Sequence, residues 1–212
     1  MDTAFIIKFF GALFAIMNPF SGLPIFLSMT QGSSVKVQRR IAIQVGFYLA
    51  VLGTTTALAG AQILMFFGIG IHDLQVAGGL VVLKLAFGML SGSESSVHHG
   101  TESEQSTYAD TSSIAFYPLA FPLMMGPGTL TTLILFAGQT DGVPTWIGYF
   151  SVLFVVVVAV TVVFALGSQF GKFLSSTART IMNRLMGLIL AAIAIQMIVE
   201  GAKALLPGLA GH

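Results

Sequence analysis

The stretch "MNPFSGLPIF" (Met17–Phe26) lies inside an otherwise apolar run from Ala4 to Met29. It holds Asn18, a glycine and two prolines, which all disfavour an unbroken helix. A proline inside a helix removes one backbone hydrogen bond and costs about 3 kcal/mol or more. In lipid the freed carbonyl finds no water, so such a break must face protein or a wet cavity. The stretch therefore predicts a membrane-spanning helix that is interrupted near its middle.

The composition supports a membrane protein. The 212 residues are 55% hydrophobic and 8% charged, with a mean hydropathy of +0.92. Soluble domains carry about 25% charged residues, so the lipid bilayer is the expected solvent. A net charge of +1 gives no basic field for nucleic acid. The chain has no cysteine, which excludes disulfides and thiolate metal sites.

Six segments are long and apolar enough to cross a bilayer, which needs about 20 residues per helix. The predicted fold class is therefore an all-α membrane protein with six transmembrane helices. The fifth segment is bulky and β-branched, and we expect it to face lipid. The predicted spans are Ala4–Met29, Ile41–Gly68, Leu74–Leu90, Ile114–Ala137, Trp146–Phe170 and Ile181–Leu206.

Lys and Arg near the span ends predict the orientation. Six of them would lie on one side, against Lys8 and Lys203 on the other. This bias predicts that the first, third and fifth loops are cytoplasmic and that both termini are outside. The N-terminus has no basic n-region, so we interpret it as the start of the first span. The six residues are Lys36, Arg39, Arg40, Lys172, Arg179 and Arg184.

A second unusual stretch, "FPLMMGPGTL" (Phe121–Leu130), matches the first. Pro19 and Pro24 are five residues apart, and so are Pro122 and Pro127. Each pair lies in the first span of its half. Two matching breaks favour a shared purpose over two unrelated proline kinks, although kinks are common in membrane helices.

The third spans of the two halves also align. The alignment matches Gly79 with Gly187 and Ala86 with Ala194. Three spans per half is an odd number, so the second half must enter the membrane upside down. The sequence therefore predicts two inverted three-helix repeats with broken first and fourth helices, as in many secondary transporters.

The predicted repeats are residues 1–90 and 114–212, joined by a flexible acidic linker, 91–113. The linker is rich in Ser, Glu and His and lacks a hydrophobic period, which is typical of a solvated loop. It also contains residue types that can bind a divalent metal, but their spacing fits no defined site. These are His98, His99, Glu94, Glu102 and Glu104.

The breaks predict a binding site between the two halves. We expect Pro24 to open a half-helix, Ile25–Met29, and Pro127 to open another from Gly128 or Thr129. Each helix start exposes free N–H groups and about half a positive charge. Two starts that converge from opposite sides suit a carboxylate. The candidate substrate-binding residues are Asn18, Pro19, Ser21, Gly22, Pro24, Gly126, Pro127, Gly128, Thr129 and Thr132.

Two further polar residues are candidates for coupling or for a counter-charge. Lys84 falls in the middle of the third span, where a charge is expensive and suggests function; alternatively, it snorkels to the interface. Gln196 lies one turn from Glu200 and either takes part in coupling or belongs to a solvated helix end. No predicted span contains histidine, and no Ser–His or paired-Asp arrangement lies at membrane depth, so we expect no enzyme.

Three motifs together resemble the MarC family of bacterial and archaeal inner-membrane proteins. They are "NPFSGLPIFLSMT" (Asn18–Thr30), "PLAFPLMMGPGTLTT" (Pro118–Thr132) and "RLMGLILAAIAIQMIVEG" (Arg184–Gly201). The family includes proteins of the SnatA type, described as small neutral amino acid transporters. Many members have "NPxGNxP" where this chain has "NPFSGLP". Ser21 and Gly22 thus replace Gly and Asn, and a side-chain amide is missing from the expected pocket.

The resemblance implies a six-span protein of a prokaryotic cytoplasmic (inner) membrane, in a family of which some members transport glycine, alanine or similar amino acids. We expect no cofactor, and H⁺ or Na⁺ is a possible coupling ion. A homo-oligomer is as permissible as a monomer. Two alternatives remain open: a cation, metal or other small-solute exporter, and a membrane protein that transports nothing and serves as a partner of another complex.

Overall fold

The computed structural model describes residues 3–91, 114–170 and 176–206. These residues form helices joined by short turns and contain no strand. The helices are α1 (Thr3–Met17), α2 (Pro19–Met29), α3 (Val35–Phe66), α4 (Ile71–Ser91), η1 (Ala115–Met124), α7 (Pro127–Ala137), α8 (Val143–Phe170) and α9 (Ser176–Leu205).

The described helices confirm the six-span prediction. Five helical stretches are long and apolar enough to cross a membrane, and the bent pair η1–α7 supplies the sixth span. The main difference is at α3, which begins at Val35 rather than Ile41. Its polar first turns are still helical because the Ser34 hydroxyl caps the N–H of Val37 at 3.4 Å. Hydropathy alone does not detect a helix that extends beyond the apolar region.

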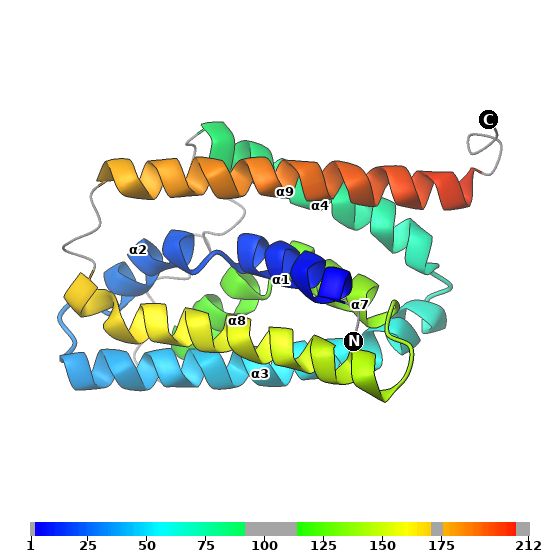
Figure 1. The fold of residues 1–212 in the computed structure, drawn as a ribbon. Coiled ribbons are helices and arrows are strands. Elements are labelled where there is room, and N and C mark those ends of the chain that lie inside the picture. Colours follow the sequence, from blue (N-terminus) through cyan, green and yellow to red (C-terminus); the bar gives the residue numbers. More distant parts are fainter. Residues whose placement is uncertain (1–2, 92–113, 171–175, 207–212) are drawn as a thin grey trace.

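The broken spans lie in the middle of the molecule. In Figure 1, α4 and α9 form one outer layer, α3 and α8 form the other, and α1, α2 and α7 run between them. The contacts agree: α1 and α2 pack on α8 and α9, whereas η1 and α7 pack on α3 and α4. Each broken span thus contacts the continuous helices of the opposite half. The main hydrophobic core contains residues of both halves, so the two halves share one core.

The α4–α9 pair is antiparallel and closely packed. A Cβ added to Gly79 would lie 3.0 Å from the Ala194 carbonyl oxygen, and one added to Gly187 would lie 3.1 Å from the Ala86 carbonyl oxygen. These contacts are reciprocal for the residues that the sequence comparison paired, as a two-fold relation between the halves would require. The inverted repeat itself stays a prediction.

The expectation that the fifth span faces lipid is wrong for one side of α8. Tyr149, Val156, Val160 and Phe164 are fully buried in the main core. The bulky side chains of α8 are accommodated by small residues on α3, since Gly46 faces Thr161 and Gly53 faces Leu153. Only the other side of α8 is exposed. Bulk therefore did not indicate lipid exposure, because bulky residues also fill the space beside glycines.

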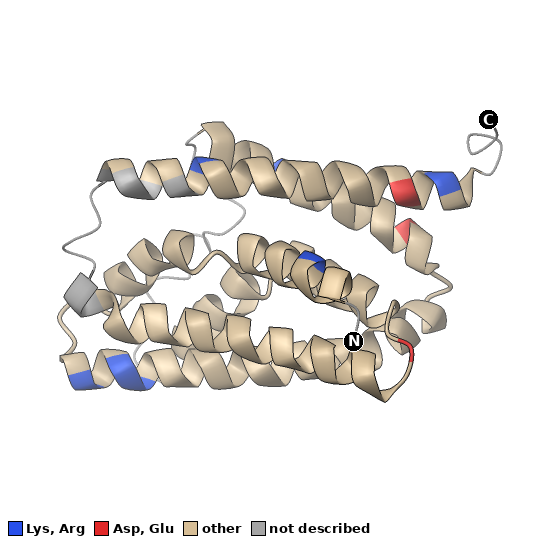
Figure 2. Ribbon diagram, in the orientation of Figure 1, with Lys and Arg blue, Asp and Glu red and all other residues tan. Residues whose placement is uncertain are grey.

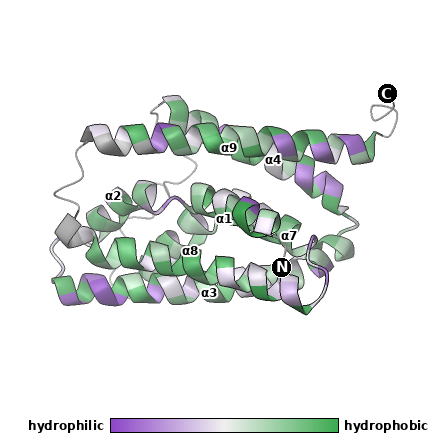
Figure 3. Cartoon of the chain, in the orientation of Figure 1, coloured by the Kyte–Doolittle hydropathy of each residue, from purple (hydrophilic) through white to green (hydrophobic). Residues whose placement is uncertain are grey.

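Polar residues gather toward the ends of the helices. Figure 3 shows hydrophobic residues along most of the bundle, with hydrophilic ones at the start of α3, in the first turns of α4 and toward the end of α9. Figure 2 places the basic residues at the start of α3 far from both chain termini. This separation agrees with the sign of the predicted charge bias. Which side is cytoplasmic stays a prediction.

Candidate functional site

The first break falls at Asn18, between α1 of 15 residues and α2 of 11. Asn18 has φ 26° and ψ 82° and is the N-cap of α2, with its Oδ1 accepting from the Ser21 N–H at 3.3 Å. Pro19 follows as the first helical residue, where its missing N–H costs nothing. Asparagine is one of the few residue types that tolerate a positive φ. The break is therefore built by Asn-Pro.

One part of the sequence prediction for this break is wrong. Pro24 does not open a half-helix, because α2 already begins at Pro19 and Pro24 lies inside it. The physical reason is capping: Asn18 supplies an acceptor and Pro19 a suitable φ, so the helix starts five residues earlier. Pro24 then removes a single bond from a helix that is already nucleated.

The second break lies between η1 and α7, which are bent by 66°. Tyr117 and Phe121 have extended backbone angles within η1, so this half of the span is irregular. Gly126 is the extended N-cap, and α7 begins at Pro127, which confirms the predicted half-helix start to within a residue. Gly126 brings no capping side chain. The first backbone hydrogen bond of α7 runs from the Leu130 N–H to the Gly126 carbonyl at 3.0 Å. The N–H groups of Gly128 and Thr129, which come before it, therefore have no acceptor within the helix.

The two breaks lie against each other. On the N-terminal side of Asn18, the Ile16 side chain would lie 3.8 Å from a Cβ built on Gly128. On the C-terminal side, a Cβ built on Gly22 would overlap the Met124 side chain. The two broken spans therefore run antiparallel with the breaks at the same level. Phe9 of α1 stacks on Phe136 of α7 with ring centroids 4.8 Å apart, which agrees with the same antiparallel alignment of the two spans. The starts of α2 and α7 thus meet near the middle of the two broken spans and point in opposite directions.

Buried polar groups gather on these two spans. Asn18 is 3% exposed and Thr132 is 1% exposed, and neither the Asn18 Nδ2 nor the Thr132 Oγ1 has a hydrogen-bond partner. Leaving a buried donor unpaired costs about 1–3 kcal/mol. Thr129, in contrast, donates its hydroxyl to the Met124 carbonyl at 2.8 Å across the bend. The first break therefore has a free amide donor, and α7 has a free hydroxyl in its second turn.

Little space surrounds the breaks. A Cβ on Gly22 would also approach Phe164 to 3.0 Å, and one on Gly128 would approach Val82 and Leu85 to 3.3 Å. Gly126 and Gly128 are buried, whereas Pro127 between them is exposed. The backbone at the second break is therefore enclosed except at Pro127. Any guest here must be small.

The structure places the remaining predicted residues away from the unpaired groups or gives them partners. The Ser21 hydroxyl donates to Asn183 of α9 at 2.7 Å. Lys84 is exposed on α4. Gln196 is also exposed and donates to Glu200 at 2.8 Å, and so does the buried Gln75 at 3.2 Å.

Sequence reasoning missed two of these partners. Asn183 and Gln75 are ordinary polar residues near the ends of spans, and nothing local indicates a partner 162 or 125 residues away. Both join α9 to elements of the first half, so they were detectable only from the tertiary structure.

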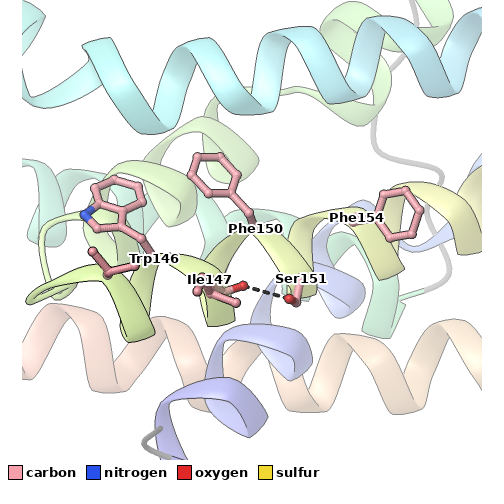
Figure 4. Close-up of a pocket in the computed structure, with 6 residues that line it drawn as sticks. Trp146, Ile147, Phe150, Ser151 and Phe154 are labelled. Atoms are coloured by element: carbon pink, nitrogen blue, oxygen red, sulfur yellow. Dashed lines mark hydrogen bonds between the residues drawn. The ribbon is translucent and has the colours of Figure 1, made fainter.

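An apolar groove also lies on α8, but it differs from the paired breaks. Its volume is about 500 Å³, and it is lined by one side of α8. Figure 4 shows its only hydroxyl, that of Ser151, bonded to the Ile147 carbonyl of the same helix. Because Ile147 and Phe154 are mostly exposed, this groove faces the surroundings, and its hydroxyl already has a partner. The lining residues are Val143, Trp146, Ile147, Phe150, Ser151 and Phe154.

The suggested metal ligands lie outside the described residues, as does the linker from residue 92 onward. Within the described part of the chain, no group of three His, Cys, Asp or Glu side chains could hold a metal ion.

The fold and the paired breaks define a multi-pass helical membrane protein in which two discontinuous spans meet. The chain matches the family model "MarC family integral membrane protein" over residues 3–206, and it belongs to that family. The membrane protein YvbG of Bacillus subtilis is 33% identical over 98% of both chains. YhcE of Escherichia coli is 31% identical over 95% of this chain and 94% of its own. A membrane protein of Methanocaldococcus jannaschii is 31% identical over 96% and 98%. No solved structure matches.

Proposed function

We propose that this protein is a secondary transporter of small neutral amino acids, of the glycine and alanine class, in the cytoplasmic membrane. The observation that carries the proposal is the unpaired Asn18 amide at the place where two helix starts meet. Membership of the MarC family and the resemblance to SnatA-type proteins support the same substrate class.

The paired breaks offer what an amino acid carboxylate needs. The Asn18 Nδ2 is a donor without an acceptor, and the uncapped start of α7 presents two further N–H groups. A helix N-terminus favours negative charge through its dipole. A carboxylate bound there would satisfy the Asn18 donor and recover about 1–3 kcal/mol of desolvation cost. The Thr132 hydroxyl is a second unpaired group on α7 that could receive the ammonium group.

Size selection follows from the glycines. Gly22 and Gly128 each lie against side chains of other helices, so an added methyl group already meets neighbours. A guest that enters between these spans has room for a small side chain at most. The proposal assigns no catalytic step and no cofactor, and the coupling ion is H⁺ or Na⁺.

The test is uptake of labelled glycine and alanine into liposomes that contain the purified full chain. Asn18→Asp is the sharpest variant, because it keeps the oxygen that caps Ser21 and replaces only the free donor by a repelling carboxylate. Asn18→Gly removes the amide while tolerating the positive φ. We expect both variants to fold and to lose uptake by at least about tenfold, which corresponds to 1.4 kcal/mol.

Gly11→Ala is the matched control, since a Cβ there meets nothing within 4 Å, and it should retain full uptake. Imposing a proton gradient or a sodium gradient in separate samples identifies the coupling ion. If wild-type liposomes accumulate neither amino acid under either gradient, the proposal fails. If Asn18→Asp transports as well as wild type, the assignment of the site fails while the function survives.

A further inference from the structure

The outer face of the α4–α9 layer carries two exposed cations, Lys84 and Arg184. Lys84 is seven residues from the end of α4 at Ser91, or about 10 Å along the helix axis. A charge at this depth is expensive in hydrocarbon. Among the described residues neither cation has an acidic partner, so an anionic ligand would complement the charge of this face.

The contacts of α4 show that Lys84 points away from the bundle. Gly78 faces Thr131 of α7, and Gly79 faces Ala194 of α9. The side chains on the remaining face recur every three or four residues and are exposed. These are Leu80, Lys84 and Phe87.

The contacts of α9 place Arg184 on the same layer. Gly187 faces α4, whereas Arg184, three residues earlier, is exposed, as is Leu188. In Figure 1, α4 crosses behind α9, and its last turns emerge beyond α9 on the side away from α3. Near this end of the layer, exposed residues of both helices lie on the surface of the bundle.

The antiparallel register brings the two cations to the same end of this surface. Gly187 lies beside Ala86 and Met89 of α4, so Arg184 is level with the last turn of α4. Lys84 is about six to seven residues deeper, or roughly 10 Å, on an axis about 8–10 Å away. Long flexible stems let both charged heads approach one point at the shallower level.

We propose that Lys84 and Arg184 together bind the phosphate of an anionic phospholipid on the outer face of α4 and α9. Basic pockets between membrane helices are suited to lipid head groups. Leu80 and Phe87, which are 55% and 59% exposed, lie beside Lys84 and contact the acyl chains. The proposal does not depend on what the protein transports.

A second copy of the chain suits this face less well than a lipid. A two-fold axis along the membrane normal would bring the same cations of both copies to the same depth. The described acids are at the other end of the layer or on another loop, since Asp73 lies in the first turn of α4, Glu200 lies near the end of α9, and Asp141 precedes α8. Like charges would then meet without compensation.

The test is native mass spectrometry of the purified full chain titrated with phosphatidylglycerol or phosphatidylcholine. We expect wild type to prefer phosphatidylglycerol. Each cation near an anionic surface contributes about fivefold in affinity, so Lys84→Gln with Arg184→Gln should weaken phosphatidylglycerol binding about 25-fold. Phosphatidylcholine binding should not change. The charge-retaining variant Lys84→Arg should bind phosphatidylglycerol like wild type.

The control removes two other exposed cations, by Lys8→Gln with Lys203→Gln, and loses the same net charge. It should keep the affinity of wild type for phosphatidylglycerol. Equal losses in the two double variants would show that net charge alone attracts the lipid and would overturn the proposal. Unchanged lipid binding in the Lys84 and Arg184 variant, with a change of oligomeric mass, would assign the face to a second copy instead.

Discussion

The glycines between α4 and α9 allow a stability prediction worked from distances. In Gly79→Ala the new Cβ would lie 3.0 Å from the Ala194 carbonyl oxygen and 3.2 Å from the Ile198 nitrogen. Ordinary contacts lie at 3.4–4 Å. Both neighbours are backbone atoms and cannot rotate away, so the helices must separate by several tenths of an ångström. Overpacking of this kind costs about 1–3 kcal/mol.

The comparison must be made with another Gly-to-Ala change, because alanine also raises helix propensity by about 1 kcal/mol. Gly11→Ala on α1 is this reference variant, since its added Cβ would have no neighbouring atom within 4 Å. A cost of 1 kcal/mol lowers the melting midpoint by about 2–4 °C in a chain of this size. Gly79→Ala should therefore melt about 2–12 °C below Gly11→Ala.

The assay is the fraction of protein that remains monodisperse after heating, followed by size-exclusion chromatography of a fluorescent fusion. Gly187→Ala should lose as much as Gly79→Ala, because its Cβ would lie 3.1 Å from the Ala86 carbonyl oxygen. If Gly79→Ala melts at or above Gly11→Ala, the close approach of the two helices is wrong. Clearly unequal losses at the two glycines would argue against a two-fold relation.

Three other substitutions test the region of the breaks and the polar contacts of α9. Thr132→Val removes an unpaired buried hydroxyl, so we expect a midpoint raised by about 2–12 °C together with reduced glycine uptake; a raised midpoint with full uptake would mean that the hydroxyl serves no guest. Thr129→Val should lower the midpoint by a similar amount because the Met124 carbonyl loses its donor, whereas Thr129→Ser should keep it within a few degrees; equal midpoints for the two variants would contradict this. Glu200→Gln should cost under about 1 kcal/mol of stability, since Glu200 is exposed. It should keep glycine uptake within about twofold of wild type at each pH tested. If wild-type uptake varies with pH and the variant's uptake does not, Glu200 is a coupling group.

The spans illustrate how far hydropathy reaches. It located all six because the bilayer imposes a fixed length on every apolar segment. It misplaced the start of α3, where a serine cap rather than apolar character sets the boundary. It also misjudged α8, because a run of valines has the same hydropathy whether its side chains face lipid or pack against the glycines of a neighbouring helix.

By itself, the sequence determined that the chain crosses a membrane, that its first and fourth spans are interrupted, and that α7 begins at Pro127. These features are local, because proline and asparagine restrict their own backbone wherever they occur. Only the tertiary structure decided that the two breaks meet, that Asn18 keeps an unpaired donor, and that Lys84 faces outward. The physical reason is that pairing and burial depend on residues more than 100 positions away, brought together by the packing of whole helices.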